Sequence, residues 1–263
     1  MTDSPSQNID LPTQAPANAP AHGMALLRFT GECLRYLVQM RIDGREWLRH
    51  IDRLYVRALP LLLAGSVVVG GVVAMQGLGY VSRYQATEVF GWAAGVSAFR
   101  EVGPLLLGLI LAARIGARNA AELGSMVLQE RLAALQALGL DTMRVVALPR
   151  VLAIISAACL AYPLVSLTIL GSSFGIAKVV GDQRWAISVH SCLEYMSHHV
   201  VWDGFIRLSG FGIWVAITST YYGLSADHTK GGIGHAVYRA SVAAMVGIVL
   251  LNLYLTLSTG STS

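Results

Sequence analysis

Four long stretches without a charged residue constrain what this chain can fold into. They cover residues 58–82, 151–177, 208–226 and 240–263. A helix needs about 20 apolar residues to cross the hydrocarbon core of a bilayer, and each stretch comes close to that length or exceeds it. The stretches are continuous rather than alternating, which argues against the strands of a transmembrane barrel. We therefore expect membrane-spanning helices, which satisfy their own backbone hydrogen bonds.

The composition agrees with one polytopic membrane domain. Of the 263 residues, 54% are hydrophobic and only 13% are charged, with a mean hydropathy of +0.57, whereas soluble domains carry about 25% charged residues. Residues 1–20 contain no apolar run and no Lys or Arg, so we expect no cleaved signal peptide. We predict a disordered tail over residues 1–27 and a single membrane domain over residues 28–263.

The arginines gather on two segments of the chain. Seven precede the first apolar stretch: Arg28, Arg35, Arg41, Arg45, Arg49, Arg53 and Arg57. Five more lie from Arg114 to Arg150, and the positive-inside rule assigns both segments to the cytoplasm. Two segments on the same side require two spans between them, so a further span is needed near residues 96–121. The predicted spans are 58–80, 96–121, 149–175, 205–225 and 237–258. They place the N-terminus in the cytoplasm and the C-terminus outside.

The predicted span at residues 96–121 carries an unusual pattern of charge. Arg100 and Glu101 are followed by 12 uncharged residues and then by Arg114. Twelve helical residues rise only about 18 Å, against a hydrocarbon core of roughly 30 Å. The helix must therefore extend past the apolar run at one or both ends. The simplest solution begins the span near Gly95 and places Arg100 and Glu101 below the outer interface. Charges at such depth face a bundle interior or a water-filled cavity. The alternative is that Arg100 reaches the headgroups while Glu101 caps a helix start.

Residues 31–57 form the first of two amphipathic segments. Their arginines recur every four residues, at Arg41, Arg45, Arg49, Arg53 and Arg57. A helical stripe runs beside them, made of Trp47, Ile51, Leu54 and Tyr55. A basic amphipathic helix of this kind lies on anionic lipid, where the arginines anchor it to the membrane surface. The alternative is a helix packed on another subunit.

Residues 122–139 form the second amphipathic segment, which we expect as one helix on the cytoplasmic side. Leucines mark one face, while Gln129, Glu130 and Arg131 are polar. Gly139 is the expected C-cap, and Asp141 is expected to cap the next helical turn. Because the segment is too polar to span, it either lies on lipid or docks into a groove of a soluble partner.

The sequence lacks the motifs that carry catalysis or cofactor binding. It has no GxxxxGK[ST] loop for nucleotide phosphates and no GxSxG nucleophile turn. The three cysteines show no CxxC pattern. His190, His198, His199 and Asp203 lack the spacing of a metal site, so we expect them on an outer-surface helix. We predict no enzyme activity, no metal, no bound cofactor and no nucleic-acid partner for this chain.

An ordered set of motifs over residues 99–151 resembles the MlaE-type (YrbE) permease family. The motifs read Arg100-Glu101-Val102-Gly103-Pro104, Arg114 with Gly116, Ala121-Glu122-Leu123-Gly124 with Met126, Glu130, Asp141, and Pro149-Arg150. A second block is similar and reads Tyr221-Tyr222-Gly223-Leu224, Gly232-Ile233-Gly234, Arg239 and Leu255-Thr256. The resemblance covers about residues 30–257, nearly the whole chain.

The resemblance implies a fold and a set of partners. The fold is an all-α polytopic membrane protein: an N-terminal interfacial helix and five transmembrane helices, with a cytoplasmic coupling helix between the second and third. Such proteins are homodimeric permease subunits of ABC transporters in the bacterial inner membrane. They move phospholipid or a related lipid between that membrane and periplasmic carriers. A cytoplasmic ATPase (MlaF-like) binds the ATP and Mg, a hexamer of MCE-domain proteins (MlaD-like) lies on the periplasmic side, and some systems add a STAS-domain subunit (MlaB-like).

The resemblance also implies roles for individual residues. Arg100 and Glu101 match the family's charged pair at the lipid-translocation cavity, where Arg100 would meet an anionic headgroup and Glu101 would keep the arginine oriented. Residues 122–139 correspond to the coupling helix. Coupling to the ATPase is expected at Glu122, Gln129, Glu130, Arg131 and Asp141.

Three departures from the family's pattern bear on substrate and coupling. Arg118-Asn119 stands where the family usually has small or apolar residues. Asn252 occupies a position that is often Asp in the last span. Glu130-Arg131 replaces the commoner Glu-Gln.

Other classes of function remain as alternatives. An ion-coupled secondary transporter would show inverted repeats and paired broken helices, and dependence on ATP separates it from an ABC permease. A non-transporting membrane scaffold would tolerate neutralising Arg100 and Glu101. An intramembrane lipid enzyme would need a catalytic set of His, Asp or Ser at membrane depth, and the spans hold none beyond that charged pair.

Overall fold

The computed structural model describes residues 31, 58–84, 87–140, 142–227 and 231–260, and the regular structure in these ranges is helical throughout. Five segments are long and apolar enough to cross a membrane: Leu59–Arg83, Val89–Leu128, Met143–Gly181, His198–Leu224 and Gly232–Ser258. The prediction of an all-α membrane protein with five spans is therefore confirmed. The surface helix predicted over residues 31–57 lies, apart from Gly31, outside the described residues, and so do its five arginines.

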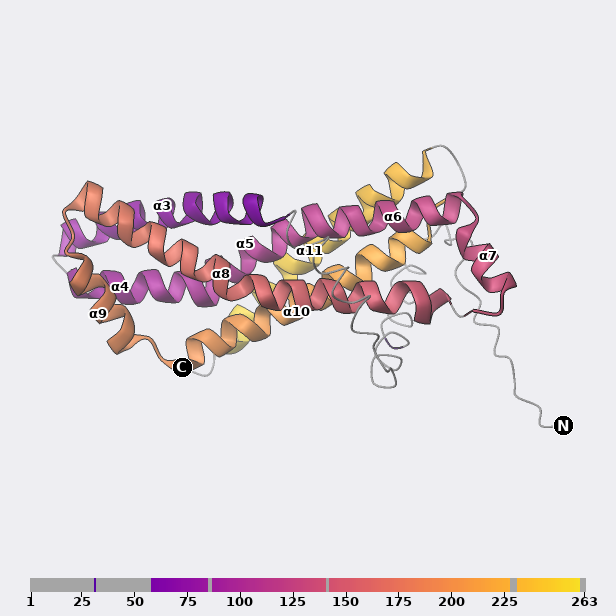
Figure 1. Ribbon diagram of the computed structural model, residues 1–263. Coiled ribbons are helices and arrows are strands. Elements are labelled where there is room, and N and C mark those ends of the chain that lie inside the picture. Colours follow the sequence, from indigo (N-terminus) through magenta and orange to yellow (C-terminus); the bar gives the residue numbers. More distant parts are fainter. Residues whose placement is uncertain (1–30, 32–57, 85–86, 141, 228–230, 261–263) are drawn as a thin grey trace.

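The spans pack side by side as an elongated helical bundle (Figure 1). Helix α3 (Leu59–Tyr84) lies along α8 (Leu148–Gly181). A Cβ added at Gly70 of α3 would collide with Ile169 and Ser172 of α8. Small residues at such contacts let two backbones approach closely and gain dispersion energy, so Gly70 fixes how these two spans meet.

Two further spans and a short helix complete the bundle. Helix α10 (His198–Leu224) packs against both α8 and α11 (Gly232–Gly260). The short helix α9 (Trp185–Tyr195) covers α4 (Thr87–Val96) at one end of the molecule (Figure 1). Helix α7 (Arg131–Ala137) lies at the opposite end.

The second span is a continuous helix that contains two π-helical segments. After α4 come η1 (Ser97–Glu101), α5 (Val102–Ile110), η2 (Leu111–Gly116) and α6 (Ala117–Leu128), with no loop between them. The apolar segment Val89–Leu128 has 40 residues, which corresponds to about 60 Å of helix, well beyond a hydrocarbon core of roughly 30 Å. Arg100 and Glu101 consequently lie within a long helix and not at its beginning.

The interior of the bundle is apolar. Leu107, Leu111, Ile154, Leu208 and Phe211 come from three different spans and are at most 1% exposed. Large apolar side chains on α3 and α11 point outward instead, including those of Val68, Leu250 and Leu253. An apolar surface of this size requires lipid or another protein to cover it.

Residues 122–139 form two helices where the sequence predicted one. Helix α6 ends at Leu128, and α7 begins at Arg131. Glu130 between them has φ = 55° and its N–H bonds to the Val127 carbonyl, an arrangement that closes helix C-termini and that usually employs glycine. The leucine periodicity continues across this turn, so the pattern did not reveal the break.

The predicted C-cap at Gly139 is confirmed. Gly139 has φ = 75°, and its N–H bonds to the Gln136 carbonyl while the Leu140 N–H bonds to the Leu135 carbonyl. This pair of hydrogen bonds is the Schellman motif, in which the left-handed residue is usually glycine because other side chains are strained there. Helix α7 is therefore bounded by a left-handed residue at each end.

Candidate functional site

Arg100 of η1 forms an ion pair across the bundle with α10. Its Nε lies 3.6 Å from Asp203 Oδ2, and the two side chains are 28% and 34% exposed. Among the described residues Arg100 donates no hydrogen bond, so this contact is ionic only. The guanidinium thus keeps unused donors although it lies inside a membrane-spanning segment.

Arg207 lies one turn beyond Asp203 on α10 and is 2% exposed. Its Nη1 donates to Asn252 Oδ1 at 3.4 Å and to Thr256 Oγ1 at 2.8 Å, both on α11. Asp203, the ion-pair partner of Arg100, lies four residues before Arg207 on the same face of α10. We call Arg100, Asp203, Arg207, Asn252 and Thr256 the Arg207 cluster. It joins the second, fourth and fifth spans through charged and polar groups.

Glu101 does not pair with its neighbour Arg100. Its side chain is exposed, and the carboxylate beside the Arg100 guanidinium is that of Asp203. Adjacent residues on a helix point about 100° apart, which separates the two side chains. The expected contact between Glu101 and Arg100 is thus not formed, and Asp203 is the carboxylate that pairs with Arg100.

Gly103 and Pro104 account for the π-helical turn that carries Arg100. A Cβ at position 103 would collide with the Ala98 carbonyl five residues earlier, so only glycine fits. Pro104 has no N–H, and in an α-helix its ring would clash with the carbonyl of Arg100 four residues earlier, so an ordinary α-helical turn does not fit there. The missing N–H also leaves the carbonyl of Phe99, five residues before Pro104, without a donor at the π-helical spacing. The sequence thus widens the helix at the charged pair.

Tyr162 of α8 supplies the donor that Pro104 lacks. Its hydroxyl lies 2.8 Å from the Phe99 carbonyl oxygen and 3.0 Å from the Val201 carbonyl oxygen of α10. Gly204 makes this approach possible, because a Cβ there would collide with both the Phe99 carbonyl and the Tyr162 hydroxyl. Tyr162 therefore ties the wide turn to the third and fourth spans.

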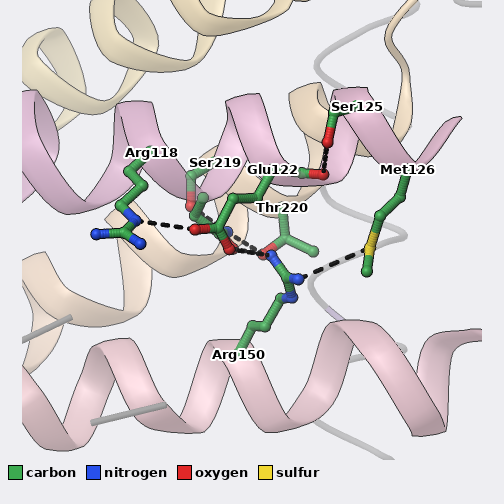
Figure 2. Close-up of polar contacts among 8 residues, drawn as sticks. Arg118, Glu122, Ser125, Met126, Arg150, Ser219 and Thr220 are labelled. Carbon is green, nitrogen blue, oxygen red and sulfur yellow. Dashed lines mark hydrogen bonds and ion pairs between the residues drawn. The ribbon is translucent and has the colours of Figure 1, made fainter. Parts of the chain in front are cut away.

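A second polar group lies near α7 and centres on Glu122 of α6 (Figure 2). Glu122 Oε1 accepts from Arg118 Nε at 2.8 Å, and Oε2 accepts from Arg150 Nη1 of α8 at 3.2 Å. Arg150 Nη2 also lies 3.7 Å from Met126 Sδ. The Glu122 carboxylate consequently joins α6 to α8 through a side chain that is 39% exposed.

Asn119 extends this group to α10. Its Nδ2 donates to Ser219 Oγ at 3.0 Å and to Thr220 Oγ1 at 3.1 Å, and its Oδ1 accepts from Arg150 Nη1 at 3.5 Å. Asn119, Ser219 and Thr220 are at most 3% exposed. We call the whole set, Arg118, Asn119, Glu122, Met126, Arg150, Ser219 and Thr220, the Glu122 network.

The residues expected to couple this chain to an ATPase occupy different environments. Gln129, Glu130 and Arg131 are exposed on the turn between α6 and α7. Glu122 is 39% exposed, and its carboxylate is bonded to Arg118 and Arg150. Asp141 and the arginines from Arg41 to Arg57 lie outside the described residues. Gln129, Glu130 and Arg131 are thus open to a docked protein, whereas the Glu122 carboxylate is already held by two arginines.

Several residues at these sites were not singled out from the sequence. Asp203 was considered only as a poor metal ligand, Asn252 only as a departure from a family pattern, and Arg207 not at all. The available signal was the spacing of Asp203 and Arg207, which are four residues apart and lie on one helical face at the edge of an apolar stretch. Among the described residues, no three His, Cys, Asp or Glu side chains converge as a metal site would require.

Five helices that are long and apolar enough to cross a membrane, with charged side chains paired between them, define a multi-pass membrane protein with a polar site along its spans. Residues 47–258 match the protein family described as Permease MlaE. The match covers most of the chain, which therefore belongs to the MlaE permease family.

Individual relatives agree with this assignment. The chain is similar to the "Intermembrane phospholipid transport system permease protein MlaE" of Haemophilus influenzae, with 29% identity over 80% of each chain. It is 31% identical to a "Probable ABC transporter permease protein" of Rickettsia prowazekii, over 76% of this chain and 77% of that protein. It is 25% identical to the chloroplastic "Protein TRIGALACTOSYLDIACYLGLYCEROL 1" of Arabidopsis thaliana, over 96% of this chain and 73% of that protein. The chain is thus a permease of the ABC transporter type.

Proposed function

We propose that this chain is the permease subunit of an ABC transporter that moves phospholipid or a related lipid. The transfer runs between the inner membrane and periplasmic MCE-domain carriers (MlaD-like), and a separate ATPase (MlaF-like) drives it. The family match and the similarity to the phospholipid transport permease of Haemophilus influenzae support this proposal. ATP and Mg are bound by the ATPase and not by this chain.

The main support for a lipid substrate is that the Arg100 guanidinium has hydrogen-bond donors without acceptors in the part of the chain that the structure describes. It lies inside a membrane-spanning segment, is partly exposed, and donates no hydrogen bond among the described residues. Hydrogen bonds from a guanidinium to a phosphate are charge-assisted and about twice as strong as neutral ones. A phospholipid phosphate would therefore satisfy Arg100, while the exposed carboxylate of Glu101 faces the rest of the headgroup.

The exposed turn before α7 is the proposed contact with the ATPase. Gln129, Glu130 and Arg131 are exposed there, and Leu138 just past α7 is 76% exposed. Polar residues beside an exposed leucine are suited to a helix that docks into a groove. Asp141 would contribute to the same contact, and Glu122 would act from within the protein.

The proposed assembly is a homodimer in the inner membrane, with a cytoplasmic N-terminus and a periplasmic C-terminus. The outward apolar side chains of α3 and α11 provide surface for lipid and for a second copy of the chain. The arginines from Arg41 to Arg57 would anchor the N-terminal segment to anionic lipid. A STAS-domain subunit (MlaB-like) would complete the complex in systems that contain one.

Affinity purification from native membranes in mild detergent tests the proposal. Protein mass spectrometry should find a P-loop ATPase and an MCE-domain protein in fixed ratio with this chain. Recovery of the chain alone, under conditions that preserve a control complex, would contradict the ABC assignment and favour an ion-coupled transporter or a scaffold.

A further inference from the structure

The Glu122 network joins three spans immediately beside α7. Glu122 lies six residues before the end of α6, and only Gln129 and Glu130 separate α6 from α7. The last backbone bond of α6, from the Gln129 N–H to the Ser125 carbonyl, and the first of α7, from the Ala134 N–H to the Glu130 carbonyl, lie on either side of this short turn. Leu132 of α7 packs with Leu123 of α6 in one buried apolar cluster, so a displacement of α7 acts directly on α6.

Burial makes the network resistant to separation of the spans. Asn119 is 3% exposed and Arg150 is 8% exposed, and the hydroxyls that Asn119 contacts belong to fully buried residues. Moving α6 away from α10 would separate the Asn119 amide from the Ser219 and Thr220 hydroxyls, and moving it away from α8 would separate Glu122 from Arg150. Each unsatisfied buried group costs about 1–3 kcal/mol, and a charged group costs more. The parts of α6, α8 and α10 that carry the Glu122 network consequently move together.

Helix α10 links the network to the Arg207 cluster. Ser219 and Thr220 of the network lie on α10, as do Asp203 and Arg207 of the cluster. The 12 residues from Arg207 to Ser219 correspond to about 18 Å of helix. A shift of α10 at the network therefore moves the charged groups of the cluster as well. The second span also connects the two sites, but the π-helical segment η2 interrupts it between them.

We propose that the Glu122 network transmits movement of α7 to α10 and so to the charged groups of the Arg207 cluster. Asn119 and Arg150 are its positioning residues, because they join α6 to α10 and to α8. The inference rests on the proposed function, since a nucleotide-driven ATPase would supply the movement.

The test measures lipid moved per ATP hydrolysed by the purified complex in phospholipid vesicles. Asn119→Ala should retain ATP hydrolysis within twofold of the unchanged complex, while lipid moved per ATP falls at least fivefold. A purely structural role would lower ATP hydrolysis and transport by the same factor and leave the ratio unchanged. An unchanged ratio, with or without loss of rate, overturns the proposal.

Two further variants keep the test decisive. Thr220→Val preserves side-chain shape, removes one acceptor of Asn119, and should lower the ratio even if Asn119→Ala does not assemble. Ser156→Ala is the matched control, because its hydroxyl bonds only to carbonyls of its own helix, Leu152 and Ala153, and its ratio should not change. If the complex without substitutions moves no lipid when ATP is supplied, the proposed function is refuted. If that complex moves lipid but the variants keep the same amount of lipid moved per ATP, only the proposed linkage is refuted.

Discussion

Arg207 Nη1 of α10 lies 3.4 Å from the Asn252 amide oxygen of α11. A guanidinium that is 2% exposed thus donates to a neutral side chain, and its shorter bond, to Thr256, is also to a neutral group. Taking a charge out of water is costly unless an opposite charge and good hydrogen bonds compensate for it. The pair therefore holds α10 and α11 together less strongly than an ion pair of the same geometry would.

Replacing the amide by a carboxylate should strengthen this contact. Asn252→Asp places a negative charge beside Arg207, and charge-assisted hydrogen bonds are about twice as strong as neutral ones. We expect a higher melting temperature for the detergent-purified protein, measured by scanning fluorimetry, and a lower one for Asn252→Ala. The gain should vanish in the Arg207→Met background. A decrease for Asn252→Asp as large as that for Asn252→Ala would contradict the contact between Arg207 and Asn252.

Removing the Tyr162 hydroxyl should destabilise the π-helical turn. Tyr162→Phe keeps the ring but leaves the Phe99 carbonyl without this donor, at a cost of about 1–3 kcal/mol for a buried unsatisfied group. The unfolding midpoint in a denaturing detergent titration should fall accordingly. Tyr222→Phe is the control, because that side chain is only partly buried, and it should have little effect. Equal midpoints for the two variants would show that the hydroxyl contact is not formed.

A methyl group at position 103 should not be tolerated. Gly103→Ala would place a Cβ against the Ala98 carbonyl, and the helix could relieve the collision only by losing its π-helical turn. We expect poor membrane accumulation or a clear loss of thermal stability. Gly171→Ala is the matched control within a span, since nothing lies within 4 Å of a Cβ there. Normal accumulation and stability of Gly103→Ala would refute the assigned turn.

Two substitutions of Glu130 distinguish the effect of its backbone conformation on stability from the effect of its carboxylate on partner binding. Its φ of 55° is the left-handed conformation, which costs residues other than glycine roughly 1–2 kcal/mol. Glu130→Gly should therefore raise stability, whereas Glu130→Ala should not. Both variants remove the carboxylate, so both should retain less ATPase in copurification if that carboxylate contacts the partner. Full retention by both would exclude Glu130 from the interface.

The sequence predicts the architecture well because membrane helices leave a strong local signal. Four spans follow from uncharged stretches, and the second follows from the distribution of arginines despite the charges at Arg100 and Glu101. The break at Glu130 escapes this reasoning, because a glutamate in the left-handed conformation has no distinctive sequence signature. Gly139, whose residue type does signal that conformation, was predicted correctly.

The polar sites are less predictable because they depend on contacts between distant segments. Arg100 attracts notice as a charge in an apolar stretch, but its partner Asp203 is about a hundred residues away. The same holds for Asn119 and the hydroxyls of Ser219 and Thr220. Local patterns report helix faces and depth in the membrane, whereas the pairing of side chains follows from how the spans pack.

Reconstitution tests the central claim most directly. The complex recovered with this chain would be placed in vesicles containing a labelled phospholipid, and transfer of label to or from the MCE-domain protein would be followed with and without ATP. We expect ATP-dependent transfer that Arg100→Ala and Glu101→Gln each reduce at least tenfold without loss of assembly. Transfer that does not depend on ATP, or that both variants support at the normal rate, would contradict this account.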